Sequence, residues 1–177
     1  MFLSKYLEVF AFLHQLIFNF FSMNRQMVQN LSFIDQTRVA VWGWSYGGFL
    51  AGQMLAEDRR GLLSCAAAVA PVVKWQLYGK WQWNRYLPFF ITKAVYFTKD
   101  SAYTERYMGL PGPDGNWKGY ENSDLSAKAV RFFGKNFFLI HGTADDNVHF
   151  QQSMVLVRAL VDYNILFRLQ VCLKKGR

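Results

Sequence analysis

Cysteine and histidine are scarce in this chain of 177 residues, and their scarcity excludes several kinds of site. The two cysteines, Cys65 and Cys172, form no C-x-x-C pair, which argues against a zinc site or a redox pair. They permit one disulfide without requiring it. We expect neither a metal ion nor a cofactor in this chain.

The sequence also lacks an apolar run long enough to span a membrane, which needs about 20 such residues. The strongest candidate, residues 6–21, is shorter and contains Glu8 and His14. Lys5 precedes it as in a signal peptide, but no cleavage site between small residues follows. Three interpretations of residues 6–21 stay open, namely a signal, an anchor, and an amphipathic or artefactual segment, and we favour the last.

The charge is basic, but its distribution does not indicate a nucleic-acid partner. The formal net charge is +8, yet the lysines and arginines are scattered, and the densest group lies at residues 174–177. A nucleic-acid-binding domain would show a basic stripe or a recognisable module. The chain is 52% hydrophobic and 18% aromatic, so it is able to bury a core, and its length suits one domain.

The stretch that organises the rest is VAVWGWSYGG at residues 39–48, which indicates an apolar strand, a sharp turn and a helix start. Within it, residues 43–47 match the G-x-S-x-G nucleophile elbow around Ser45. A serine becomes a useful nucleophile when the backbone exposes its hydroxyl near a base. Gly43 and Gly47 are expected to relieve crowding at the turn, and the Tyr46 N–H is expected to face an oxyanion. The alternative is a glycine-rich turn with an idle serine.

Strands and helices alternate along the rest of the chain. Four apolar runs predict buried strands: 38–42, 65–71, 137–140 and 165–171. Two segments predict helices, 46–58 and 150–163. This alternation is typical of an α/β fold with a mostly parallel, doubly wound sheet.

Two further segments do not fit that alternation. Residues 100–119 are polar and rich in glycine, and the sequence LPGP at 110–113 indicates turns within them. Residues 79–99 are crowded with aromatic side chains and are interrupted by Pro88. We interpret them as an insertion, either a hydrophobic flap or sequence foreign to the fold.

An elbow serine needs a base and an acid that orients it, in the chain order serine, acid, histidine. Asp145 follows an apolar strand and fits the acid, although Asp146 competes with it and an Asx turn would also explain the pair. His141 is expected at the strand end and His149 at the next helix start. The base belongs in a loop after the following strand, so we do not expect His149 to act as the base.

At this point four blocks of sequence resemble the catalytic domain of the prolyl oligopeptidase family, in its branch of dipeptidyl peptidase IV and fibroblast activation protein. The blocks are RVAVWGWSYGGF at 38–49, AVAPV at 68–72 with Trp75, DSAYTERYMGLP at 100–111, and LIHGTADDNVHFQQS at 139–153. With the segments that join them, they cover roughly residues 34–78 and 100–167. The last block is long and highly specific.

The resemblance implies a partial α/β-hydrolase fold and a serine exopeptidase that removes N-terminal dipeptides from peptides with a penultimate proline or alanine. It makes Ser45 the nucleophile, Asp145 the triad acid and Tyr46 the donor of an oxyanion N–H. It implies a proline pocket lined or bordered by Val72, Trp75, Tyr78, Tyr103, Asn147 and Val148. A flat apolar pocket with aromatic walls suits a proline ring, which offers no hydrogen-bond donor.

The sequence also departs from the family. The family's histidine follows the last strand, whereas this sequence ends soon after residues 165–171, so we expect the isolated chain to be inactive. The first strands of the sheet are also absent. The expected organisation is an atypical N-terminal segment at 1–33, a partial peptidase catalytic domain at 34–171 with an insertion at about 79–99, and an atypical tail at 172–177. Cys65 resembles a family cysteine whose partner lies beyond this sequence, so we expect it to be unpaired.

A non-catalytic role is the alternative. The family dimerises through this domain, and aromatic side chains at 79–99 offer an interaction patch. A truncated isoform would then act as a binding partner, as a homodimer or as a heterodimer with a full-length relative. The resemblance further implies a cell-surface or secreted protein, with any type II membrane anchor outside this chain.

Overall fold

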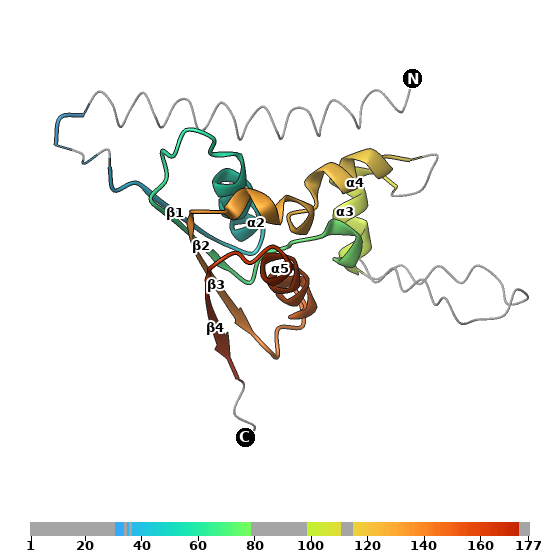
Figure 1. Cartoon of the computed structure of the whole chain (residues 1–177). Coiled ribbons are helices and arrows are strands. Elements are labelled where there is room, and N and C mark those ends of the chain that lie inside the picture. The colour runs from blue at the N-terminus through green and yellow to red at the C-terminus, as the bar shows by residue number, and fades with distance from the viewer. Residues whose placement is uncertain (1–30, 34, 36, 79–98, 111–114, 174–177) are drawn as a thin grey trace, which may run out of the picture.

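Four parallel strands form the frame on which the other elements are placed. In this computed structural model, residues 31–33, 35, 37–78, 99–110 and 115–173 are described. The strands lie side by side in chain order: β1 (Ala40–Trp44), β2 (Cys65–Val69), β3 (Asn136–Gly142) and β4 (Arg168–Cys172) (Figure 1). All three neighbouring pairs are parallel. The carboxyl ends of the strands therefore share one edge of the sheet, where such sheets place functional groups.

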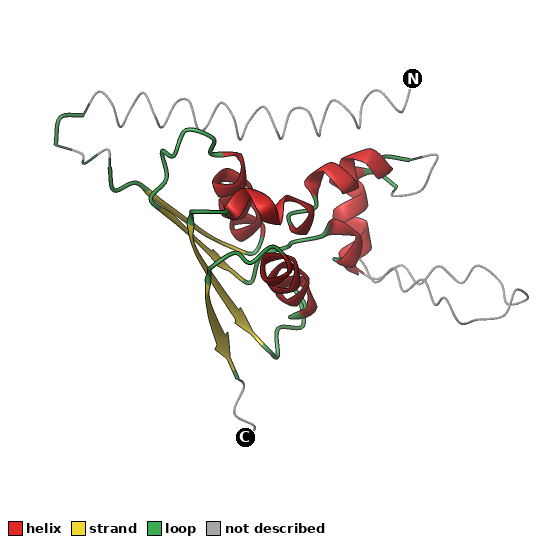
Figure 2. Cartoon of the chain, viewed as in Figure 1, coloured by secondary structure: helices red, strands yellow, loops and turns green. Residues whose placement is uncertain are grey.

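The helices of the described part gather on one side of this sheet, as Figure 2 shows. Helix α2 (Tyr46–Glu57), the 3-10 helix η2 (Ser126–Phe132) and helix α5 (Gln151–Asp162) surround one apolar core. The strands contribute Ala66, Ala68, Phe137 and Leu139 to it, and the helices contribute side chains that include Leu55, Phe132 and Leu156. Removal of these side chains from water stabilises the packing of helices on the sheet.

The opposite face of the sheet is open in the described part of the chain. Trp42 on β1 is 73% exposed, and Trp44 and Phe138 are also exposed. Side chains alternate along a strand, so these exposed residues lie opposite the buried Ala66, Ala68 and Leu139. A hollow of about 560 Å³ crosses this face, with residues from all four strands along it.

The polar, glycine-rich segment at 100–119 has more regular structure than its composition indicates, and the turns predicted at 110–113 lie outside the described residues apart from Leu110. It contains helix α3 (Lys99–Met108) and helix α4 (Trp117–Ser123). Gly109, with a φ of 73°, follows α3 in the left-handed conformation that favours glycine at helix ends. Asn116 caps α4, because its side chain accepts a hydrogen bond from Gly119 N at 3.2 Å. The polar residues and glycines thus mark the ends of two short helices.

Several expectations concern residues that are not described. The apolar segment at 6–21 and the insertion at 79–99, apart from Lys99, lie outside the described residues, as do residues 174–177 of the tail. Cys65 and Cys172 are free and exposed in the described part. Within that part, no helix combines the length and the apolar character needed to cross a membrane.

Candidate active site

Ser45 occupies the sharp turn between β1 and α2. Its backbone has φ 56° and ψ −116°, a conformation that a residue with a side chain rarely adopts and that stores strain. The Ser45 N–H donates to the carbonyl of Val69 on the neighbouring strand β2 at 2.9 Å. This bond ties the turn to the sheet and holds Ser45 at the carboxyl edge, which is the placement expected of an elbow serine.

The two glycines of the elbow motif have different reasons to be glycine. A Cβ on Gly43 would lie 2.1 Å from the carbonyl oxygen of Gly47, which is a backbone atom. The expectation that Gly47 itself relieves crowding was wrong, because a Cβ there meets no described atom within 4 Å outside its neighbours and its own helix. Gly48 is the tighter position, with Val69 O at 3.0 Å from its Cβ position. The close approach of α2 to β1 and β2 therefore depends on Gly43 and Gly48.

Tyr46 connects the elbow to an aromatic cluster. As the first residue of α2, it has an N–H that no carbonyl within the helix can accept. The positive end of the helix dipole favours negative charge at this point. The Tyr46 ring packs 5.9 Å from the rings of both Phe49 and Trp75. Burial, together with the adjacent Tyr103, raises the pKa of Tyr46 to about 12, so its phenol is neutral at physiological pH.

Trp75 is the centre of this cluster, and five of the six residues expected along the proline pocket are in it or touch it. Trp75 is 5% exposed and packs edge-on against Phe49 at 5.3 Å and Tyr78 at 5.7 Å. Val72 and Val148 are buried in the same cluster. Tyr103 extends it toward the surface, 6.1 Å from the Tyr78 ring. The result is a wall of rings that begins beside Ser45.

Asn147, the sixth expected residue, joins the wall to the loop after β3. Its side-chain oxygen accepts a hydrogen bond from the Tyr78 hydroxyl at 3.0 Å. Side chains from after β2, from α3 and from after β3 therefore meet at the carboxyl edge. Sequence reasoning missed three members of the cluster, Phe49, Met108 and Tyr120, which are buried behind the expected residues. The apolar spacing around Phe49 in the predicted helix was the available signal for one of them.

Asp145 lies in the same loop and is held in a fixed position. Its Oδ1 atom accepts hydrogen bonds from the backbone N–H groups of Asn147 and Val148, both at 3.0 Å. This is the Asx-type turn that was weighed as an alternative to a catalytic role, but it uses only one carboxylate oxygen. Asp145 Oδ2 lies 3.7 Å from His141 Nε2. Since β2 separates β1 from β3, Ser45 and Asp145 follow strands about 10 Å apart.

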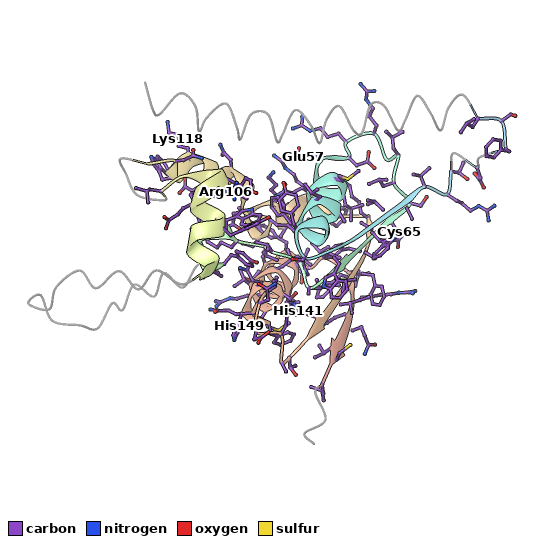
Figure 3. All side chains as sticks on the ribbon, turned by 180° about the vertical axis from the view of Figure 1, so that it is seen from behind. Glu57, Cys65, Arg106, Lys118, His141 and His149 are labelled. Carbon is purple, nitrogen blue, oxygen red and sulfur yellow. The ribbon has the colours of Figure 1, made fainter. Side chains whose placement is uncertain are left out.

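His141 and His149 both lie beside α5 (Figure 3), but neither forms a described hydrogen bond with Ser45. His141 is buried, and its Nε2 lies 2.8 Å from the carbonyl oxygen of Val148, so Nε2 carries the proton. Its Nδ1 lies 2.6 Å from Ser153 Oγ and accepts from that hydroxyl. Both nitrogens are therefore occupied. His149 is exposed, and its Nδ1 accepts from Gln151 N at 3.3 Å.

Acidification is expected to destabilise the fold through His141. Burial lowers the pKa of His141 below its ordinary value of 6.5, against the opposing effects of the Val148 carbonyl and Asp145 and with a small contribution from His149. The unfolded chain then binds a proton more readily, so the stability from His141 is complete above pH 6.5 and decreases as the pH falls below it. For one proton, the slope reaches about 1.4 kcal/mol per pH unit.

The measurement is urea unfolding at pH 7.5, 6.5 and 5.5, followed by circular dichroism. His141→Gln keeps a donor for the Val148 carbonyl, and its free energy of unfolding is expected not to decrease with falling pH in this way. His149→Gln, at the exposed histidine nearby, is the matched control and is expected to retain the decrease. An identical pH dependence in all three proteins would contradict the assignment.

Comparison with known proteins identifies a family and relatives that this chain resembles. A family model described as "Prolyl oligopeptidase family" matches residues 17–93 and 86–176. Venom dipeptidyl peptidase 4 of Apis mellifera is 43% identical over 148 residues, which are 84% of this chain and 16% of that protein. Dipeptidyl peptidase 4 of Bos taurus is 44% identical over 138 residues, which are 78% of this chain and 15% of that protein. The chain thus spans about a sixth of the length of the relatives it matches.

A solved structure agrees with the sequence comparison. The crystal structure of Porphyromonas gingivalis dipeptidyl peptidase 4 superposes with a TM-score of 0.64 and 34% sequence identity. The superposition covers 82% of this chain and 17% of that chain. The parallel sheet, the strained turn after β1 and the helices on one face are accordingly part of a partial α/β-hydrolase fold.

Proposed function

Because this chain belongs to the prolyl oligopeptidase family, we propose that it carries the nucleophile, the acid and the proline pocket of a serine dipeptidyl peptidase. Its substrates are peptides whose penultimate residue is proline or alanine. Ser45 is the nucleophile, Tyr46 gives an oxyanion N–H, and Asp145 is the acid. The observation that supports this most strongly is that Tyr46 directly follows the strained Ser45 and packs on Trp75.

The chemistry follows from that connection. A proline ring packed against Trp75 and Tyr78 brings its own carbonyl carbon to Ser45. The Ser45 oxygen bonds to this carbon while a base takes the hydroxyl proton, and the N–H of Tyr46 stabilises the negative charge on the carbonyl oxygen. The C–N bond then breaks, and the leaving amine receives the proton. Water repeats the sequence on the acyl-enzyme and releases the dipeptide.

We further propose that none of the described residues acts as the base and that this 177-residue stretch has no turnover by itself. Both nitrogens of His141 already have partners, and His149 is exposed in the turn before α5. Asp145 supports an imidazole, but it cannot replace one, because a carboxylate at neutral pH is a weak base. Substrate binding does not need a base, so binding and turnover are separable in this chain.

The experiment uses an aminoacyl pyrrolidide, which carries the ring of a penultimate proline without a scissile bond. Binding to the chain is measured by nuclear magnetic resonance titration, and we expect saturation with a Kd of roughly 1 mM, or about −4 kcal/mol. The control ligand is the aminoacyl diethylamide, which has the same tertiary amide but no ring, and severalfold weaker binding is expected for it. Equal binding of both ligands, or no saturable binding of the pyrrolidide, would exclude the proline pocket.

Turnover is measured on the same protein with a Gly-Pro chromogenic substrate, and the Ser45→Ala variant sets the background. We expect the two proteins to give equal rates. A higher rate that depends on Ser45 would show that the chain supplies its own base and would overturn the proposal of inactivity.

A second candidate function is a non-catalytic one, association with another copy of the chain or with a full-length relative. The open face of the sheet, with Trp42, Trp44 and Phe138 exposed, favours it. Sedimentation as a monomer that captures no full-length relative would exclude this role. For location we propose the cell surface or a secreted state, supported by the venom origin named for one relative.

A further inference from the structure

Gln152 is a buried polar residue that no step of the proposed reaction uses. It lies in the first turn of α5, is 1% exposed, and reaches backbone 79 residues earlier in the chain. Its Oε1 accepts hydrogen bonds from the N–H groups of Val73 at 2.9 Å and Lys74 at 2.8 Å. Its Nε2 donates to the carbonyl oxygen of Lys74 at 3.1 Å. One side chain thus satisfies three backbone groups.

These three groups belong to a segment that has left the sheet. After β2 the chain turns at Ala70, where φ is 42°, and it runs without regular structure to the 3-10 helix η1 (Trp75–Leu77). Buried backbone groups away from a ladder need other partners. The carbonyl of Val73 finds one in the N–H of Leu125 at 3.0 Å. The carbonyl of Lys74 accepts from the N–H of Leu77 at 2.9 Å as well as from Gln152. For the N–H groups of Val73 and Lys74, Gln152 takes the place of a neighbouring strand.

The segment that Gln152 holds carries one wall of the proposed pocket. Val72 and Trp75 flank the two bonded residues, and both side chains are buried in the aromatic cluster. Helix α5, which carries Gln152 in its first turn, begins soon after the loop that contains Asp145, Asn147 and Val148. Gln152 therefore connects the pocket wall that follows β2 to the acid-bearing loop that follows β3.

The chemistry of the contact selects an amide at this position. The backbone of Val73 and Lys74 is bonded to one oxygen that accepts two hydrogen bonds and one nitrogen that donates one. A carboxylate supplies the acceptor but sets a second negative oxygen against the Lys74 carbonyl. Leucine, of similar size, supplies neither and leaves buried polar groups unpaired.

We propose that Gln152 is a positioning residue, which fixes Val72 and Trp75 relative to Asp145 and so sets the shape of the pocket for a five-membered ring. This inference rests on the proposed function only for the identity of the ligand. The placement of the Val73 and Lys74 backbone by Gln152 is a separate physical claim, and it has its own measurement.

The test compares the full chain with Gln152→Leu and Gln152→Glu, and Gln151→Leu is the matched control at the exposed neighbour. Hydrogen exchange of the Val73 and Lys74 amides is expected to accelerate at least tenfold in Gln152→Leu, while amides within β2 and β3 keep their rates. Binding of the aminoacyl pyrrolidide is expected to weaken at least tenfold. Gln151→Leu is expected to change neither quantity.

Gln152→Glu provides a rescue that depends on pH. Burial at this position raises the pKa of a carboxyl group, and a protonated glutamic acid carries both a C=O acceptor and an O–H donor. Pyrrolidide binding relative to the unsubstituted chain should therefore recover between pH 7.5 and pH 5.5. A residue that only filled space would show no such recovery. This variant also tests the inference if Gln152→Leu does not fold, since its carboxyl group keeps the size of the amide.

The outcomes separate the two proposals. If the unsubstituted chain does not bind the pyrrolidide, the proposed function fails, and the amide exchange rates still decide the role of Gln152. If the chain binds the ligand and folded Gln152→Leu binds it equally well with unchanged exchange at Val73 and Lys74, the positioning role is wrong. The same holds if Gln152→Glu shows weakened binding with no recovery at low pH.

Discussion

Gly43→Ala is expected to lower the free energy of unfolding by about 3 kcal/mol or more, and Gly47→Ala to leave it unchanged or raise it by up to about 1 kcal/mol. The two residues belong to the same motif, and the substitutions add the same methyl group. On Gly43 that group would lie 2.1 Å from the Gly47 carbonyl oxygen. A backbone atom inside a helix cannot move aside as a side chain does, so β1 and α2 must separate.

At Gly47 the added Cβ meets open space among the described residues, and alanine is the better helix former. Urea unfolding of the two variants beside the unsubstituted chain measures both effects. The pyrrolidide titration should follow the same division, with binding lost in Gly43→Ala and retained in Gly47→Ala. Equal destabilisation by both substitutions would mean that the motif requires both glycines for the space they leave.

Trp75→Ala is expected to destabilise the fold by about 3 to 5 kcal/mol, which is the range for removal of a large buried ring. Trp75 packs against Tyr46, Phe49 and Tyr78, so its loss opens a cavity between the elbow helix and the pocket wall. Trp75→Phe keeps an aromatic ring in the cavity and should recover part of the stability.

The matched control is Trp42→Ala, because Trp42 is 73% exposed on the open face of the sheet. Its effect is expected within about 0.5 kcal/mol, as for other exposed positions. Thermal unfolding of Trp75→Ala, Trp75→Phe and Trp42→Ala measures which of them loses most stability. A loss at Trp42 as large as that at Trp75 would contradict the description of this face as open.

The parts of the fold that depend on local sequence were predictable. The family and the partial α/β-hydrolase fold are confirmed, and each predicted strand and helix is present with its ends shifted by a few residues. The elbow was recognisable because its chemistry occupies five consecutive residues, from Gly43 to Gly47. The roles of Ser45, Asp145 and the pocket residues stay predictions, although the structure brings the pocket residues together.

Other features could not be predicted, because they arise between segments far apart in the chain. The segment around α3 and α4 has the composition of a loop, and its helices depend on contacts such as the hydrogen bond from the Tyr120 hydroxyl to the Gly109 carbonyl at 2.7 Å. The free space around the Cβ position of Gly47 depends on how α2 packs against the rest of the described chain. Gln152 resembles any polar residue on an amphipathic helix until its partners at Val73 and Lys74 are known.

The order of the strands has a consequence for synthesis on the ribosome. Because β1, β2, β3 and β4 lie side by side in the order in which they occur in the chain, each of the described strands after β1 finds a neighbour already made when it emerges. None of these four described strands has to be inserted between two others that were completed earlier. The sheet can therefore grow in one direction at the pace of translation, and its newest edge is always the one that awaits the next strand.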